Sequence, residues 1–146
     1  MIKAILPFVI SIFDGMIKRH REDNDTVYDY ADGRVKILTY HNRGAFLNMG
    51  DSKPLVVLLL SIGLTAILSF VFLVSFGRRG TEALRTGLAF LLGGAFSNTY
   101  DRLKKGYVVD YLNFPKAPFG IKNVIFNLSD FAIIIGSLIS VLANRD

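Results

Sequence analysis

Four aspartates lie inside or just beyond apolar stretches of this 146-residue chain, namely Asp14, Asp101, Asp110 and Asp130. An ionisable side chain in such a stretch is costly, which makes each of them a candidate for function. Two carboxylates held close together cannot both ionise easily, so they share one proton. One can then take a proton from water while the other donates a proton to a carbonyl oxygen. Such a pair could hydrolyse an amide bond without a metal or a cofactor.

Local partners divide these aspartates into two groups. Lys18 follows Asp14 by four residues, so the two can pair on one face of a helix, and a basic residue directly follows Asp101. We therefore expect structural roles for Asp14, Lys18 and Asp101. Asp110 and Asp130 have no obvious local partner. If the apolar stretches nearest to them form neighbouring antiparallel helices, these two carboxylates lie at the same end of the bundle.

Apolar segments long enough to cross a membrane must position these side chains. The chain is 51% hydrophobic, with a mean hydropathy of +0.41. Residues 54–76 carry no charge, and at ~1.5 Å per residue they cross a hydrocarbon core of ~30 Å. Residues 1–17, 81–100 and 124–143 carry a few charges and are weaker candidates. We predict four transmembrane helices over these ranges, with both termini on the same side.

The chain is interpreted as a single integral-membrane domain over residues 1–146. No small-residue cleavage site follows the first apolar segment, so we read it as an uncleaved span. Residues 18–53 form a long loop in which Asp32 and Gly33 predict a tight turn, because a type I′ turn needs positive φ at both central positions. We expect a β-hairpin over about residues 26–41, at the membrane surface. The predicted fold class is an all-α membrane protein with a small β-lobe between its first and second helices.

Small residues recur at a spacing of four in the last two predicted spans. They are Ala89 and Gly93, and then Ala132, Gly136 and Ser140. Small residues let helix backbones approach closely in lipid, where packing replaces the hydrophobic driving force. This spacing is consistent with contact between the spans.

Composition excludes several other kinds of chemistry. The chain has no cysteine, so it has no thiol nucleophile, disulfide or cysteine-based metal site. His20 and His41 are the only histidines and do not cluster, and we expect no metal site. The net charge is +5, but basic residues are scattered among acids and form no stripe for nucleic acid. Anionic lipid headgroups are the partner that this charge favours.

The distribution of basic residues gives two opposite indications of orientation. Arg78, Arg79 and Arg85 cluster at the short turn between the second and third spans, which indicates a cytoplasmic turn. With Lys3 and Arg145 that side has five basic residues, whereas the other side has twelve. The plain count therefore favours the opposite orientation.

Two sequence runs carry a resemblance to a known family. The run GGAFSNTYDRLKKGYVVDYLNF, followed by IFNLSDFAIIIG, resembles the lipoprotein signal peptidase family, also called signal peptidase II. That family shows Gly-Asn-x-x-Asp-Arg, then Gly-x-Val-Val-Asp-Phe, then Phe-Asn-x-Ala-Asp. The resemblance extends to Asp14 and Lys18 and to NRGAF at residues 42–46, and so touches nearly the whole chain.

The resemblance implies an aspartyl endopeptidase of the bacterial inner membrane, with four transmembrane helices and an extracytoplasmic β-lobe. It would cleave prolipoprotein signal peptides just before a diacylglyceryl-modified cysteine, with membrane lipids as neighbours, no cofactor and a monomeric state. Asp110 and Asp130 would be the catalytic pair. The family places this pair at the extracytoplasmic face, which is the opposite of the orientation that the plain count of basic residues favours. Positions expected to hold the site or the substrate are Asn42, Gly44, Asn98, Arg102 and Asn127.

The chain departs from the family pattern at four positions. Ser97 stands where the family usually has Gly, Ser129 where it has Ala, and Asn113 where it often has an acid. Phe46 replaces a small residue of the loop motif, and we expect it to narrow the substrate groove and change specificity.

Two alternative functions remain open. An altered groove would suit a non-catalytic paralogue that binds lipoproteins or lipid, although retention of Asp110 and Asp130 favours an enzyme. Intramembrane carboxylates also relay protons, as in a small proton-coupled transporter. The chain lacks the duplicated halves that many transporters show.

Overall fold

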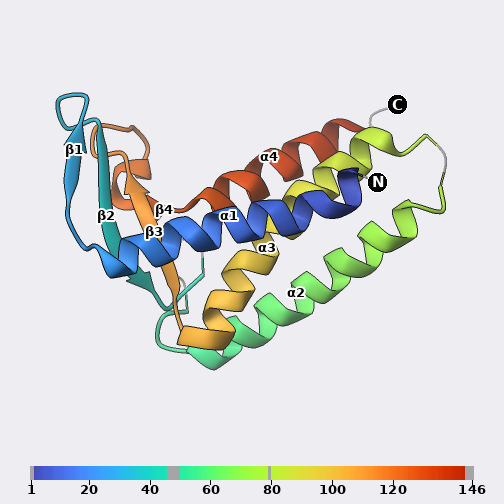
Figure 1. Cartoon of the computed structure of the whole chain (residues 1–146), viewed down its shortest axis with the longest axis horizontal. Helices are drawn as coiled ribbons and strands as arrows, with labels where there is room; N and C mark the ends of the chain where they lie inside the picture. The colour runs from blue at the N-terminus through green and yellow to red at the C-terminus, as the bar shows by residue number, and fades with distance from the viewer. Residues whose placement is uncertain (1, 46–49, 79, 144–146) are drawn as a thin grey trace.

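The computed structural model describes residues 2–45, 50–78 and 80–143. In these ranges, helices bundle lengthwise and a small sheet closes one end (Figure 1). The start of α1 and the end of α4 lie at the opposite end. In chain order the elements are α1 (Ile2–Asp23), β1 (Tyr28–Tyr30), β2 (Val35–Asn42), α2 (Pro54–Ser75), α3 (Glu82–Lys105), β3 (Val108–Asn113), the 3₁₀ turn η2 (Ile121–Asn123), β4 (Ile125–Phe126) and α4 (Leu128–Ala143).

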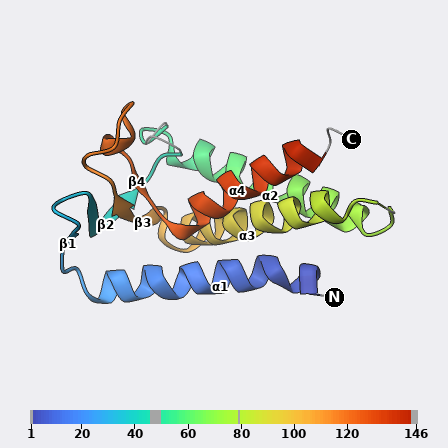
Figure 2. The ribbon, with the colours of Figure 1, turned by 90° about the horizontal axis from the view of Figure 1, so that it is seen from above.

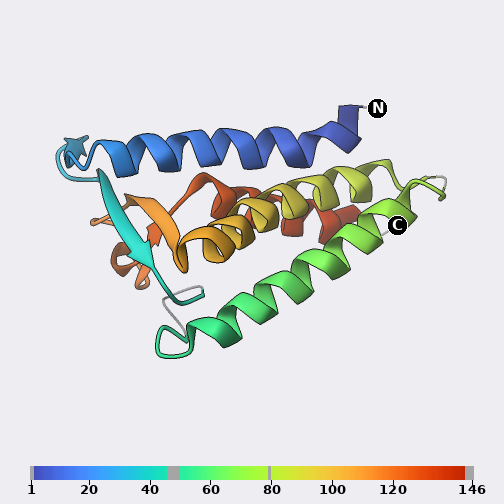
Figure 3. The same cartoon turned by 60° about the horizontal axis from the view of Figure 1, so that its bottom comes forward.

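Helix α3 is the centre of the bundle and packs against α1, α2 and α4. Helix α1 runs along one side of α3 and α4 (Figure 2), and α2 diverges from them on the other side (Figure 3). Glycines permit the close contacts, as expected from their spacing. A Cβ at Gly136 would lie 2.6 Å from the Gly87 carbonyl oxygen, and one at Gly93 would lie 2.8 Å from Ile10 Cβ. Helices α1 and α4 can therefore approach the backbone of α3 closely, the kind of packing that small residues permit.

The sheet is larger than the hairpin that we predicted. The hairpin is present: Asp32 and Gly33 both have positive φ, and the Arg34 amide donates to the Ala31 carbonyl at 3.2 Å. Strand β2 also pairs with β3, and β3 with β4, in the antiparallel order β1-β2-β3-β4. Asp110 lies on β3, opposite Tyr40 in the register. Pairing over a long sequence separation creates this strand, and a local pattern does not reveal it.

Three helix boundaries differ from the predicted spans by more than one residue. Helix α1 continues to Asp23 instead of ending at residue 17, so the loop after it is shorter than predicted, and at the other two boundaries a capping residue explains the difference. Helix α3 continues to Lys105 and ends at Gly106, whose φ of 80° is left-handed and whose amide donates to the Arg102 carbonyl. Glycine ends helices in this way because it has no Cβ to clash. Helix α4 begins at Leu128 instead of residue 124, since residues 125–126 form β4 and Asn127 caps the helix.

One described helix, α2, is long and apolar enough on its own to cross a membrane, with a mean hydropathy of 2.7 over its most apolar window. Its outward face exposes large apolar side chains, among them Leu59, Leu60, Ile67, Phe70 and Leu73. Helix α4 is apolar but has 16 residues. Helices α1 and α3 carry several charges. The crossing of the membrane by all four helices stays a prediction.

Candidate active site

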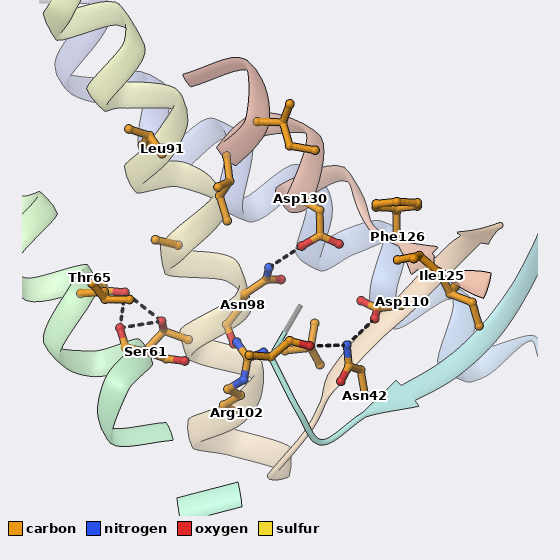
Figure 4. A pocket seen from close by; sticks show the side chains of 18 of the residues that line it. Asn42, Ser61, Thr65, Leu91, Asn98, Arg102, Asp110, Ile125, Phe126 and Asp130 are labelled. Atoms are coloured by element: carbon orange, nitrogen blue, oxygen red, sulfur yellow. Dashed lines mark hydrogen bonds between the residues drawn. The ribbon is translucent and has the colours of Figure 1, made fainter. Parts of the chain in front are cut away.

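The fold brings Asp110 and Asp130 to one cavity. Gly106 turns the chain back after α3, so β3 places Asp110 beside that helix, while Asp130 lies in the first turn of α4. Both carboxylates line a cavity of about 630 Å³ beneath the sheet (Figure 4). Asp110 is only 2% exposed, and Asp130 is half-buried.

Side-chain amides hold both carboxylates. Asn127 Nδ2 donates to Asp110 Oδ1 at 2.7 Å, and Asn42 Nδ2 donates to Asp110 Oδ2 at 2.9 Å. Asn98 Nδ2 donates to Asp130 Oδ1 at 3.1 Å. The two bridging amides also meet, since Asn127 Nδ2 lies 3.2 Å from Asn98 Oδ1. Asn98 and Asn127 thus link the two aspartates into one unit.

Helix capping fixes the orientation of the Asn127 amide. Its Oδ1 accepts from the Asp130 backbone N–H at 2.9 Å, and Asp130 Oδ2 accepts from the Asn127 backbone N–H at 2.9 Å. This reciprocal pair is a capping box, which satisfies backbone donors at the start of α4. Because its oxygen faces a backbone donor, the Asn127 NH₂ group must point toward Asp110.

Burial makes Asp110 a weaker acid than an ordinary aspartic acid side chain. Removal from water, and then the nearby charge of Asp130, raise the pKa of Asp110 from 3.8 to about 7, although hydrogen bonds from Asn42 and Asn127 oppose the rise. A carboxylate in low dielectric disfavours its charged form, and a like charge adds to that effect. Asp110 therefore retains a proton for much of the time near neutral pH.

The residues expected to be structural form a second cluster, centred on Lys18, whose side chain is fully buried. The Lys18 Nζ lies 2.7 Å from Asp14 Oδ2 and 3.1 Å from Asp101 Oδ2. It also donates to Ser97 Oγ at 3.0 Å and to Asn98 Oδ1 at 2.8 Å. The expected Asp14–Lys18 ion pair is thus present. Asp101 pairs with Lys18 and Lys105, and not with the neighbouring Arg102.

Of the remaining expected site residues, Asn42 and Arg102 line the cavity, and Gly44 contacts Arg102 without lining it. Arg102 Nη2 donates to the buried Gly44 carbonyl at 2.8 Å. Among the described residues, Asn42 Oδ1 and Arg102 Nε are buried with no hydrogen-bond partner. Buried polar atoms are normally paired, so these two atoms stand out among the residues that line the cavity. Phe46, expected to narrow the groove, lies outside the described residues.

The cavity is lined by both polar and apolar side chains. Hydroxyls line the α2 side, where Thr65 Oγ1 and Thr99 Oγ1 share a hydrogen bond of 2.8 Å beside Ser61. Our sequence reasoning missed Ser61 and Thr65, because a hydroxyl in an apolar span gives no distinguishing signal. Apolar side chains from α2, α3 and α4 complete the lining: Leu64, Leu68, Leu91, Ile133 and Ile134.

The described residues include no group of three or more His, Asp or Glu side chains arranged to hold a metal ion. The site combines two carboxylates, their amide donors and a cavity lined in part by apolar side chains.

Known proteins share this fold. A solved structure described as a bacterial membrane enzyme superimposes with a TM-score of 0.81 at 21% identity, covering 97% of this chain and 85% of that one. A second bacterial membrane enzyme superimposes with a TM-score of 0.78, covering 99% of this chain and 93% of that one. The fold is therefore that of a bacterial membrane enzyme.

Sequence similarity defines the family. The sequence profile of signal peptidase (SPase) II matches residues 6–144, so the chain belongs to the signal peptidase II family. A lipoprotein signal peptidase of Moorella thermoacetica is 37% identical over 105 residues, which are 70% of this chain and 63% of that protein. The chain thus spans about two thirds of the length of such relatives.

Proposed function

We propose that the protein is an aspartic endopeptidase that removes signal peptides from lipidated prolipoproteins ahead of the diacylglyceryl-cysteine. The observation that carries this proposal is the Asp110–Asp130 pair, joined by amides and facing a partly apolar cavity. Membership of the signal peptidase II family supports the substrate class. The non-catalytic and transporter alternatives have no specific observation in their favour.

The two aspartates have different tasks in the proposed reaction. Asp110, with its raised pKa, holds the shared proton and donates it to the oxygen of the scissile carbonyl. Asp130 takes a proton from water as the water oxygen attacks the carbonyl carbon. The tetrahedral intermediate then collapses: the leaving amine takes the proton from Asp130 as the C–N bond breaks, and the carbonyl re-forms as its hydroxyl returns a proton to Asp110.

The cavity supplies contacts for such a substrate. An apolar signal-peptide segment fits against the apolar part of the lining, near Leu68 and Ile133. Asn42 Oδ1 can accept from a peptide N–H, and Arg102 Nε can donate to a peptide carbonyl. Both atoms are buried without a described partner, so an unbound site leaves them unsatisfied and substrate would satisfy them.

We further propose that the protein is a monomer with four spans in the bacterial inner membrane, with lipids around the bundle and the sheet end extracytoplasmic. The apolar outward face of α2 supports lipid contact. Because the chain has no native cysteine, single cysteines can report the orientation. Cysteines replacing Gly33 or Lys116 should react with an impermeant thiol reagent from outside, and one replacing Gly80 should not. The reverse pattern would show that the count of basic residues gives the true orientation.

The direct test of function is incubation of the purified protein with a lipidated prolipoprotein. We expect the shorter, lipidated product to appear, and neither Asp110→Asn nor Asp130→Asn to form it. The same prolipoprotein without its lipid should be a poor substrate. Absence of the product with folded wild-type protein would refute the proposed function.

A further inference from the structure

Two buried serines from different helices donate to the same carboxylate oxygen. Ser97 Oγ on α3 and Ser129 Oγ on α4 each donate to Asp14 Oδ2 at 2.6 Å. Ser97 is 4% exposed and Ser129 is fully buried. These are the positions where the chain departs from the Gly and Ala of the family pattern. One shared acceptor on α1 therefore accounts for both departures.

The Lys18 ammonium connects this carboxylate to the candidate active site. The ammonium has three N–H groups, yet four oxygens lie within 3.1 Å of Nζ: Asp14 Oδ2, Asp101 Oδ2, Ser97 Oγ and Asn98 Oδ1. These acceptors must compete. The Asn98 oxygen is neutral, as is the Ser97 hydroxyl oxygen, so it attracts the ammonium less strongly than the two carboxylates do, and it still lies at 2.8 Å.

The hydroxyls of Ser97 and Ser129 weaken the attraction of the Asp14 carboxylate for the Lys18 ammonium. Each donates to Asp14 Oδ2, the oxygen that also faces Lys18, and so offsets part of its negative charge. Ser97 Oγ in addition accepts from Lys18, which keeps the ammonium on the α3 side of the cluster. Without these hydroxyls, the ammonium would move toward Asp14 and away from Asn98.

The ammonium helps to determine how the Asn98 amide is turned, together with the Asn127 NH₂ group, which also donates to Asn98 Oδ1. An ammonium only donates hydrogen bonds, so the atom of Asn98 that faces Lys18 must be its oxygen. The NH₂ group must then face Asp130, to which it donates at 3.1 Å. A connected path of hydrogen bonds therefore runs from Ser129 and Ser97 through Asp14 and Lys18 to Asn98.

We propose that Ser97 and Ser129 are positioning residues for the reaction, which hold the Lys18 ammonium on Asn98 and so keep the Asn98 amide donating to Asp130. The inference rests on the proposed peptidase function. It assigns the serines no contact with substrate, so their loss should lower kcat and leave KM unchanged. We expect about a 10-fold fall in kcat for Ser129→Ala or Ser97→Ala, because misplacing a reacting group by about 1 Å costs on the order of 100-fold.

Volume-matched variants separate hydrogen bonding from packing. Cysteine fills nearly the same space as serine but is a weak donor, so Ser97→Cys and Ser129→Cys should behave as the alanine variants do. Ser75→Ala is the matched control, because Ser75 is also 4% exposed and its hydroxyl bonds the Phe72 carbonyl far from the cavity. That control should keep the wild-type kcat even if its thermal stability falls.

A measurement that does not depend on turnover separates this test from the test of the proposed function. The Asn98 side-chain ¹⁵N–¹H₂ resonances, identified by their absence in Asn98→Ala, should shift in Ser129→Ala and Ser129→Cys and stay in place in Ser75→Ala. A shift would support the positioning path whether or not the wild type cleaves the prolipoprotein. Unchanged Asn98 resonances, or cysteine variants with wild-type kcat, would overturn the inference.

Discussion

Two clusters of buried carboxylates lie beside each other at the sheet end of the bundle, and Asn98 belongs to both. In the first, Asp14 and Asp101 surround the Lys18 ammonium. In the second, Asp110 and Asp130 receive only hydrogen bonds from amides, and the described residues place no cation within 4.0 Å of either carboxylate. The first cluster is sealed within the bundle, whereas the second faces a cavity.

A cation in direct contact distinguishes the first cluster from the second, and we propose that this difference separates a structural cluster from a reactive one. A buried carboxylate beside an ammonium stays ionised and ties its helix to the helix that carries the ammonium. A buried carboxylate with amide donors alone can hold or release a proton near neutral pH, as the raised pKa of Asp110 indicates. The four aspartates thus fall into two groups, one paired with an ammonium and one held by amides. The surrounding residues determine the group to which each aspartate belongs.

Removal of the cation should have the largest effect on stability. Lys18→Met keeps a long apolar stem but leaves Asp14 and Asp101 buried without their shared partner. We expect a loss of ~3–5 kcal/mol in the free energy of unfolding, the usual result of breaking a buried ion pair from one side. Chemical unfolding in detergent measures it. Arg19→Ala is the control, since the Arg19–Asp23 pair is exposed and its loss should change little. Equal stabilities for Lys18→Met and the wild type would contradict the structural role of the first cluster.

Asp101→Asn should have a smaller destabilising effect. Asp101 lies 3.1 Å from Lys18 Nζ and 3.2 Å from Lys105 Nζ, and asparagine keeps its size while removing its charge. We expect a loss of ~1–3 kcal/mol in the free energy of unfolding, because a hydrogen-bonded charge is lost while its partner stays buried. The same unfolding assay measures it. A stability at or above that of the wild type would place Asp101 with the reactive cluster instead.

Asp110→Asn, the same substitution in the second cluster, should have the opposite sign. The pKa of Asp110 rises from 3.8 to about 7 on folding, so the stability that its proton contributes is lost as pH rises through about 7. Asparagine removes that dependence. The midpoint of thermal unfolding should therefore rise by a few degrees relative to wild type at about pH 8, and by less at about pH 5. A lower midpoint at the higher pH would show that ionised Asp110 is stabilising.

The sequence predicts the helices well and the sheet poorly. Apolar length predicts α2 almost residue for residue, and the left-handed preference of Asp32-Gly33 locates the hairpin turn. Strand β3 was missed, because its pairing with β2 joins segments about 70 residues apart and leaves no local periodicity.

Spacing accounts for only part of the site. The i,i+4 relation of Asp14 and Lys18 predicts their ion pair, which the structure contains. Spacing does not reveal that Asn98 joins the two clusters, or that Tyr111 donates to Asp14 at 2.9 Å, since these contacts need the folded positions of distant segments. The roles of the site residues remain predictions.

The cleavage rates of wild type, Asp110→Asn, Asp130→Asn and the double variant on a lipidated prolipoprotein test the central claim most directly. Thermal unfolding is measured beside them, so that activity is compared only between folded proteins. Each single variant should lose roughly three to five orders of magnitude in turnover, and the double variant should be little worse, because residues that act as a unit are strongly non-additive. Substantial turnover in either folded single variant, or a double variant whose loss is the product of the two single losses, would contradict the paired-aspartate mechanism.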